Sequence, residues 1–304
     1  MSNSYIDLHC HPSLKPYGKS FKYSPPKQNN SNSGRKNSIW HYSPPNFIEK
    51  QFNKLLTLTK FTQTDLTALA KANCNIVVIS LYPFEKHFLS KNILGVKFLP
   101  DLLVNLASGI SQKRIDNLRN HNSYFQDLND EYEFYKQLHN FAQIIEGVTY
   151  TYRLVSNYAE ISTHLKTSTA KRKIISIVPT IEGAHAFETG LHKDKNTAEA
   201  TTVLKNIESV KNWDYKPFFI TLAHHFYNEI CGHARSINIR IIKDNQNRGL
   251  DSGITDLGFK VIKNLLDNTK NKRILIDVKH MSRSSRTAYY NLLETDYADQ
   301  DIPI

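Results

Sequence analysis

The chain has 304 residues, and 40% of them are hydrophobic, which suits one large α/β domain with a full-sized core. Its three cysteines form no CxxC pair and no even set, which argues against a disulfide framework and favours a reducing compartment. The N-terminus lacks the basic-then-apolar pattern of a signal peptide, and no apolar run is long enough to cross a membrane. The sequence therefore predicts a cytoplasmic protein without a membrane partner.

The formal charge of +11 raises the question of a nucleic-acid partner. The basic residues are scattered, however, and form only short clusters such as Lys171-Arg172-Lys173, with no interleaved aromatics. Dispersed charge of this kind is typical of a solvated basic surface. A nucleic-acid partner is therefore not expected, whereas a homo-oligomer stays open.

The predicted elements alternate along the chain. A polar segment at 15–38 reads as a flexible insertion, and Thr64 is a plausible cap for a helix over 65–72. Residues from about 99 to 145 look mainly helical, with an amphipathic stretch at 130–141. Further helices are expected at 198–212, at 255–268 (with Thr255 and Asp256 as capping candidates) and at 284–293. Strands are expected at 6–12, 76–82, 173–180, 217–223 and 273–278.

Strands that alternate with helices predict a parallel sheet. Polar residues end each predicted strand, which favours a TIM (β/α)8-type barrel, because the active sites of such barrels lie at the carboxyl ends of the strands. A doubly wound sheet fits less well, since it concentrates chemistry at one switch point. About five to six strands are present, so we expect a C-terminally truncated barrel that forms a single domain over 1–304.

Candidate metal ligands lie at several of these strand ends. In an extended strand His9 and His11 project to one side and Cys10 to the other, so the two imidazoles can grip one divalent cation. The alternative is two unrelated histidines on an N-terminal loop. Later strands end at Glu182, at His224-His225 and at His280. A glutamate between histidine-bearing strands is what a two-metal centre requires, because one carboxylate can bridge two cations.

Four nearby residues have competing interpretations. Glu146 lies in a similar Ile-Glu-Gly string, but it follows a helical pattern and is expected at the surface. His185 is expected to support a ligand or to pack rather than to bind metal. Asp277 and Lys279 have the opposite strand parity to His280 and are therefore expected to face the helices.

Four strings together resemble the membrane (renal) dipeptidase family of the metal-dependent amidohydrolase superfamily. They are Ile181-Glu182-Gly183-Ala184-His185, Leu222-Ala223-His224-His225 followed by Asn228, Gly253-Ile254-Thr255-Asp256-Leu257-Gly258, and Ile276-Asp277-Val278-Lys279-His280-Met281-Ser282. The resemblance covers residues 5–12 and about 173–290, and it is poor over 13–172.

This resemblance implies a zinc-dependent hydrolase that cleaves dipeptides in a (β/α)8 barrel. By motif position, His9 and His11 would hold the first zinc, Glu182 would bridge two zinc ions, and His280 would bind the second. His224 would contact the substrate and polarise the scissile carbonyl.

The chain departs from the family at two points. The family has His-x-Asp where this chain has His9-Cys10-His11, which removes one negative charge from the first zinc site. The family's last metal histidine, its substrate-binding arginine and its acid/base aspartate would lie beyond Ile304. We therefore expect little or no peptidase activity from these 304 residues alone.

Two other functions stay open. A TatD-like metal-dependent nuclease shares the opening histidine pair, and a basic protein suits a phosphodiester substrate. A non-catalytic, truncated homologue would bind metal or a partner without turnover.

Overall fold

The computed structural model describes residues 5–21, 31–56, 61–89, 101–102, 104–105, 108–120, 123–236 and 246–303. The chain splits into two compact units. Unit 1 comprises Met1–Leu81, Leu89–His121 and Asp127–Pro179, and unit 2 comprises Tyr82–Phe88, Asn122–Gln126 and Thr180–Ile304. The single domain over 1–304 stays a prediction.

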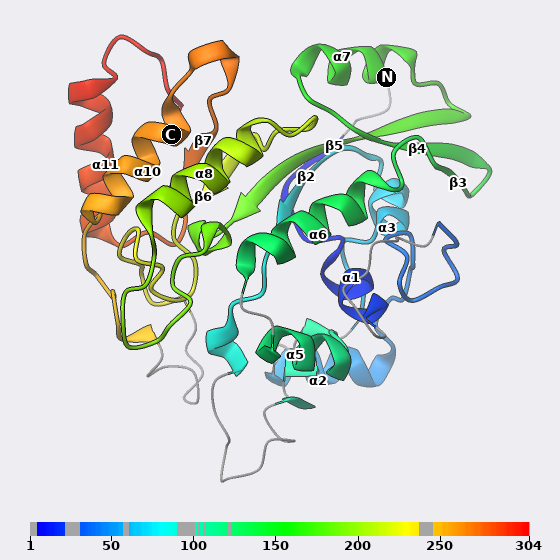
Figure 1. Ribbon diagram of the computed structural model, residues 1–304. Helices are drawn as coiled ribbons and strands as arrows, with labels where there is room; N and C mark the ends of the chain where they lie inside the picture. Colours follow the sequence, from blue (N-terminus) through cyan, green and yellow to red (C-terminus); the bar gives the residue numbers. More distant parts are fainter. Residues whose placement is uncertain are drawn as a thin grey trace. The chain divides into compact units, whose positions relative to one another are not determined.

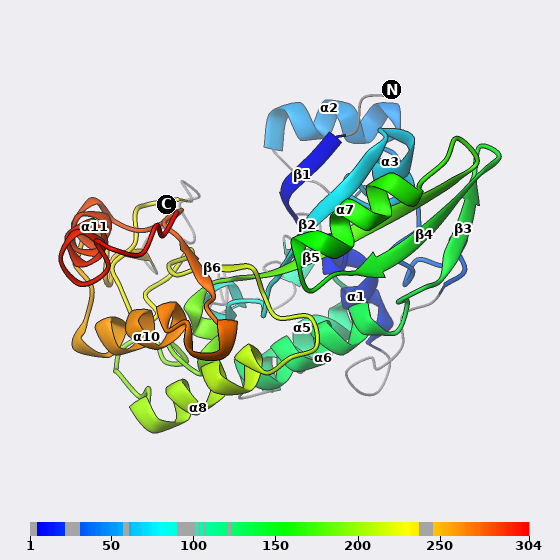
Figure 2. The same ribbon diagram turned by 90° about the horizontal axis from the view of Figure 1, so that it is seen from above.

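The strands make a mixed α/β fold with a mostly parallel, seven-stranded sheet in the described part of the chain. Unit 1 holds β1 (Tyr5–Cys10), β2 (Cys74–Leu81), β3 (Ala142–Ile145), β4 (Val148–Leu154) and the first part of β5 (Arg172–Glu182). Their order is β1-β2-β5-β4-β3 (Figure 2). β1 pairs with β2 and β4 with β5 in parallel, whereas β3 and β4 form an antiparallel hairpin.

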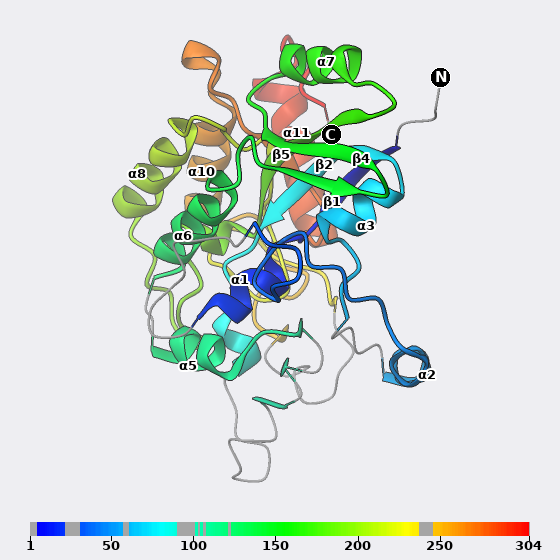
Figure 3. The same cartoon turned by 90° about the vertical axis from the view of Figure 1, so that its right-hand side faces the viewer.

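Unit 1 also carries most of the helices of the first half of the chain. They are α1 (Leu14–Ser20), α2 (Phe47–Leu56), α3 (Leu66–Lys71), α5 (Gln112–Asn120), most of α6 (Tyr124–Lys136) and α7 (Tyr158–Thr167). Helices α7 and α1 lie on opposite sides of the unit 1 strands (Figure 3). The strand β2 between them is apolar and buried on both faces, because Val77 and Ile79 lie on one face and Val78 on the other. Each such side chain contributes roughly 1.5–3 kcal/mol by leaving water.

Unit 2 extends the end of β5 with β6 (Phe219–Thr221) and β7 (Leu275–Asp277). All three are parallel, with Glu182 opposite Thr221 and Thr221 opposite Asp277. Helices α8 (Ala200–Lys211), α10 (Asp256–Leu266) and α11 (Arg283–Asp296) belong to the same unit (Figure 1). Short 3-10 turns lie at Lys86–Leu89, Ala184–Phe187 and Thr269–Asn271. The parallel register places the carboxyl ends of these three strands at one edge, where chemistry collects in α/β folds.

The five predicted strands and the predicted helices of the second half are confirmed within a few residues. Thr255 caps α10 by accepting from the Gly258 N–H, as predicted. Asp65 rather than Thr64 caps α3, because its side chain accepts from the Ala68 N–H. A closed or truncated barrel stays a prediction.

The helical prediction for 99–145 is wrong at its end. Helix α6 stops at Lys136, and residues 142–145 form β3 instead of continuing a helix. Glu146 lies in the turn of the β3–β4 hairpin with φ of 51°, and its side chain is exposed as expected. None of the helices in the described ranges combines the length and the apolar character that a membrane crossing requires.

The predicted flexible insertion at 15–38 begins as an ordered helix. The hydroxyl of Tyr17 on α1 donates to Asp127 Oδ1 at 2.9 Å. The other oxygen of Asp127 lies 2.5 Å from Arg114 Nη2, and both partners of this ion pair are buried. Residues 22–30 lie outside the described residues. The contact through Asp127 therefore ties α1 to α5 and α6.

Replacing Arg114 with Met is expected to lower the free energy of unfolding by about 3–5 kcal/mol, because it leaves the Asp127 carboxylate buried without its cation. Tyr17→Phe removes only one hydrogen bond to the same carboxylate and should cost about 1–1.5 kcal/mol. Urea unfolding followed by circular dichroism measures both. Equal losses in the two variants would contradict a dominant role for the ion pair.

Candidate active site

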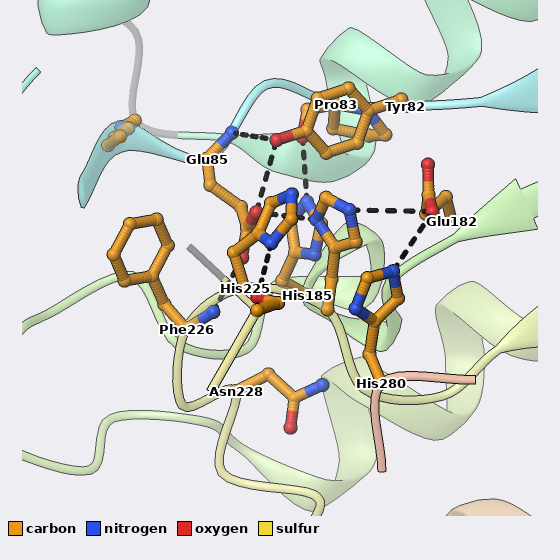
Figure 4. Close-up of polar contacts among 12 residues, drawn as sticks. Tyr82, Pro83, Glu85, Glu182, His185, His225, Phe226, Asn228 and His280 are labelled. Atoms are coloured by element: carbon orange, nitrogen blue, oxygen red, sulfur yellow. Dashed lines mark hydrogen bonds and ion pairs between the residues drawn. The ribbon is translucent and has the colours of Figure 1, made fainter. Parts of the chain in front are cut away.

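Three side chains gather where the parallel strands β5, β6 and β7 of unit 2 end. Glu182 ends β5, His224 follows the last residue of β6 by three positions, and His280 follows the last residue of β7 by three positions. Glu182 Oε1 lies 3.4 Å from His224 Nε2 and 3.8 Å from His280 Nε2. One ligand atom from each residue lies within 4.8 Å of the others. Figure 4 shows Glu182 facing His280. The parallel register thus brings together three of the residues that the sequence singled out.

His280 adopts an unusual backbone conformation. Its φ is 64°, in the left-handed region that residues with a side chain rarely occupy. A hydrogen bond from the Ala234 N–H to the His280 carbonyl, at 2.9 Å, holds this turn. Such a conformation persists only where its surroundings impose it, and it is common at functional sites. Here it turns the chain immediately after β7, where the imidazole meets Glu182.

His224 is held by a second buried carboxylate, that of Glu85. His224 Nδ1–H donates to Glu85 Oε2 at 2.6 Å, and both side chains are almost fully buried. Glu85 also accepts from the Tyr82 hydroxyl at 3.0 Å and from the Phe226 N–H at 3.1 Å (Figure 4). Since Nδ1 carries the proton of the neutral ring, the lone pair sits on Nε2 and points toward Glu182.

The protonation equilibria of this pair are coupled. Burial lowers the pKa of His224, but the charge of Glu85 and the hydrogen bond to it outweigh burial, and the net pKa is raised. Burial raises the pKa of Glu85, but the facing imidazole of His224 outweighs it, and the net pKa lies well below its usual range. The pair therefore consists of the Glu85 carboxylate beside the His224 imidazole, which is readily protonated.

The neighbouring histidines His225 and His280 behave differently. Burial, with the charge of His224, lowers the pKa of His280 to about 4 and that of His225 to about 3. Both rings are neutral at neutral pH and keep a lone pair on one nitrogen. His225 Nδ1 contacts Ser236 Oγ at 2.6 Å, so this ring is engaged outside the Glu182 cluster.

His185 and Asn228 hold the backbone around the cluster. His185 Nε2–H donates to the Pro83 carbonyl at 2.7 Å, which places this histidine in packing rather than in the ligand group. A side chain at position 183 would overlap the His185 ring, and Gly183 has φ of 92°, so glycine is required there. The Asn228 side chain donates to the Leu222 carbonyl at 2.7 Å, which fixes the loop that carries His224.

Lys279 does not follow its sequence prediction. Its ammonium lies 3.9 Å from Glu182 Oε1, so the side chain reaches toward the site instead of facing only the helices. A long, half-exposed lysine can bend back in this way whatever its strand parity. Asp277 accepts from the Thr221 hydroxyl at 2.8 Å and thereby links β7 to β6.

His9 and His11 lie together in unit 1. Their ring centroids are 5.1 Å apart, while Cys10 between them is buried, so the predicted alternation of side chains is confirmed. His11 Nδ1–H donates to the Ser80 carbonyl at 2.9 Å, which leaves its lone pair on Nε2. This hydrogen bond is the kind of support that metal-binding histidines receive. Their role as ligands stays a prediction.

Sequence reasoning missed Glu85 and Tyr82. Both follow β2 within a few residues, so their place after a predicted strand was the available signal. The run Pro83-Phe84 after the strand indicated an ordinary loop, and a lone glutamate there carried no motif.

No protein-family model matches the chain, and no curated protein matches it. Among solved structures, the chain is similar to the crystal structure of the probable dipeptidase PvdM from Pseudomonas aeruginosa. The identity is 13% and the TM-score 0.47, and the match covers 76% of this chain. The chain thus spans 43% of that protein, and a likeness of this degree carries no argument about function.

The buried Glu85–His224 pair predicts a pH-dependent stability of the metal-free protein. The raised pKa of His224 stabilises the fold below about pH 6.5, and this contribution is lost as the pH rises through the folded-state pKa. The lowered pKa of Glu85 stabilises the fold above about pH 4.3, and this contribution is lost as the pH falls. Both contributions are complete only between these two pH values.

In the presence of a chelator, Glu85→Gln should lower the free energy of unfolding by about 1.5–3 kcal/mol near pH 5.5 and by less at pH 8.5. Urea titrations across this range measure the difference from wild type. The exposed Glu294→Gln is the control and should show no such trend. A loss for Glu85→Gln that is independent of pH would contradict the charged pair.

Proposed function

We propose that the chain carries much of the active site of a zinc-dependent hydrolase that resembles the membrane dipeptidases and cleaves dipeptides with water as the nucleophile. The observation that carries the proposal is the meeting of one buried carboxylate, one buried imidazole and one half-buried imidazole (Glu182, His224 and His280) at the carboxyl ends of parallel strands. The four sequence strings around these residues support the same assignment.

The donor set fits a divalent transition metal. Imidazole nitrogen and carboxylate oxygen are ligands of catalytic zinc, and the pair of Glu182 with His280 offers one of each. His280 has the lowered pKa that makes it a neutral donor at neutral pH. Bound zinc would supply Lewis-acid polarisation of the scissile carbonyl and would make water a better nucleophile. The assignment of His9 and His11 to a first zinc stays a prediction.

The chain's own residues would attract the cation and contact the substrate. The Glu182 carboxylate is almost fully buried, and as an anion it would attract a cation strongly in a medium of low polarity. By resemblance, His224 would contact the scissile carbonyl, and Glu85 would keep its Nδ1 protonated. The half-exposed Lys279 beside Glu182 is a candidate for contact with an anionic group of the substrate.

A form of the protein that also contains the family's remaining site residues is expected to release amino acids from at least one member of a dipeptide panel when zinc is present. Glu182→Gln should lower kcat/KM by more than about 100-fold, because even the loss of a ligand's supporting residue costs 10–100-fold. Glu146→Gln is the matched control, since Glu146 sits in a similar Ile-Glu-Gly string but lies exposed in a hairpin turn. It should leave kcat/KM unchanged.

Other results would favour the alternative functions. Zinc-dependent release of nucleotides from DNA, without amide hydrolysis, would replace the dipeptidase proposal with a nuclease. Stoichiometric zinc binding without turnover of any dipeptide would indicate a non-catalytic homologue.

A further inference from the structure

We infer that His224 is itself a metal ligand, so that Glu182, His224 and His280 form a three-ligand zinc site contained in unit 2, with Glu85 as its positioning residue. This inference rests on the proposed function only in requiring that the chain binds zinc. It differs from the role that the resemblance implies for His224, which is contact with the substrate carbonyl. It also predicts that zinc binds without His9 and His11.

The direction of the His224 ring favours its role as a ligand. Nδ1 is 2.6 Å from Glu85 and Nε2 is 3.4 Å from Glu182 Oε1, so each nitrogen faces a carboxylate. The same oxygen, Glu182 Oε1, lies 3.8 Å from His280 Nε2. Two imidazole nitrogens and one carboxylate oxygen therefore converge on one small volume. A cation in that volume would replace the proton or ammonium that otherwise balances the charge of Glu182.

The hydrogen bonds that Glu85 accepts support the same role for His224. Its carboxylate holds His224 Nδ1–H, the Tyr82 hydroxyl and the Phe226 N–H, and it is almost fully buried. Metal-binding histidines usually donate their second N–H to a carboxylate or a carbonyl, which fixes the ring and makes the other nitrogen more basic. Glu85 does this for His224. Burying the carboxylate of Glu85 costs free energy. Its role in holding the His224 ring accounts for its position here.

The nearby histidines differ from His224 in the contacts that their nitrogens make. His185 donates Nε2–H to the Pro83 carbonyl, and His225 contacts Ser236 through Nδ1. Neither belongs to the group whose ligand atoms lie within 4.8 Å of one another. The ring of His225 nevertheless lies against that of His224, with centroids 3.8 Å apart. His225 is therefore a close control for effects of packing alone.

The resulting donor set is two histidines and one glutamate. This set is found in catalytic zinc sites that keep the fourth position for water or substrate. A His224 nitrogen that binds zinc cannot also donate to a carbonyl. Zinc, and not His224, would then polarise the scissile carbonyl.

Zinc affinity without substrate tests the assignment, measured at pH 7.5 by competition with a chromophoric chelator. His224→Gln should weaken zinc binding at least 10-fold, whereas His225→Gln should leave it within about 2-fold of wild type. Glu85→Ala should weaken it by about 10–100-fold, as expected for a residue that supports a ligand. Glu85→Gln, which can still accept from Nδ1–H, should recover part of this loss. Unfolding midpoints of the metal-free proteins show that each variant folds.

The double variant His9→Ala/His11→Ala should still bind one zinc ion per chain. X-ray absorption at the zinc edge of this variant should show two imidazole ligands, and it needs no substitution at His224. Unchanged zinc affinity in His224→Gln, equal losses in His224→Gln and His225→Gln, no zinc in the double variant, or a single imidazole would each overturn the inference. Absence of dipeptide hydrolysis would not, because binding is measured without substrate.

Discussion

The site depends on one imidazole held between two buried carboxylates. Glu85 and Glu182 are each almost fully removed from water, and His224 lies between them at 2.6 Å and 3.4 Å. Two negative charges in a medium of low polarity are expensive unless positive charge is supplied nearby. A protonated His224 and the ammonium of Lys279 supply some of it, and a divalent cation would supply it more completely. This balance of charge is the reason why we propose a cation site here rather than a structural ion pair.

The fold positions that cluster by simple means. Three parallel strands end side by side, and in β6 and β7 the histidine is the third residue after the strand end. Parallel pairing sets the spacing of the strand ends, so Glu182, His224 and His280 meet although they are far apart in the sequence. The left-handed turn at His280 and the requirement for glycine at position 183 show that the local backbone is adapted to this arrangement.

The strand ends were predictable because buried parallel strands leave continuous β-branched runs, and because ligand residue types follow those runs directly. The β3–β4 hairpin was missed because β3 is largely exposed and has no continuous apolar run. The helical pattern of the preceding residues was therefore extended through 142–145. Glu85 was missed for a different reason. Its importance comes from contact with His224, which is 139 positions away, and no local pattern encodes such a contact. The position of the Lys279 side chain did not follow from strand alternation, because a long side chain can bend back toward Glu182 even where its Cβ points away.

Anomalous diffraction at the zinc absorption edge, from crystals of the zinc-loaded protein, shows which side chains bind the cation. We expect a peak within bonding distance of the Glu182 carboxylate, His224 Nε2 and His280 Nε2, with Glu85 still bonded to His224 Nδ1. A zinc peak that leaves His224 uncoordinated, or none near Glu182, would contradict it.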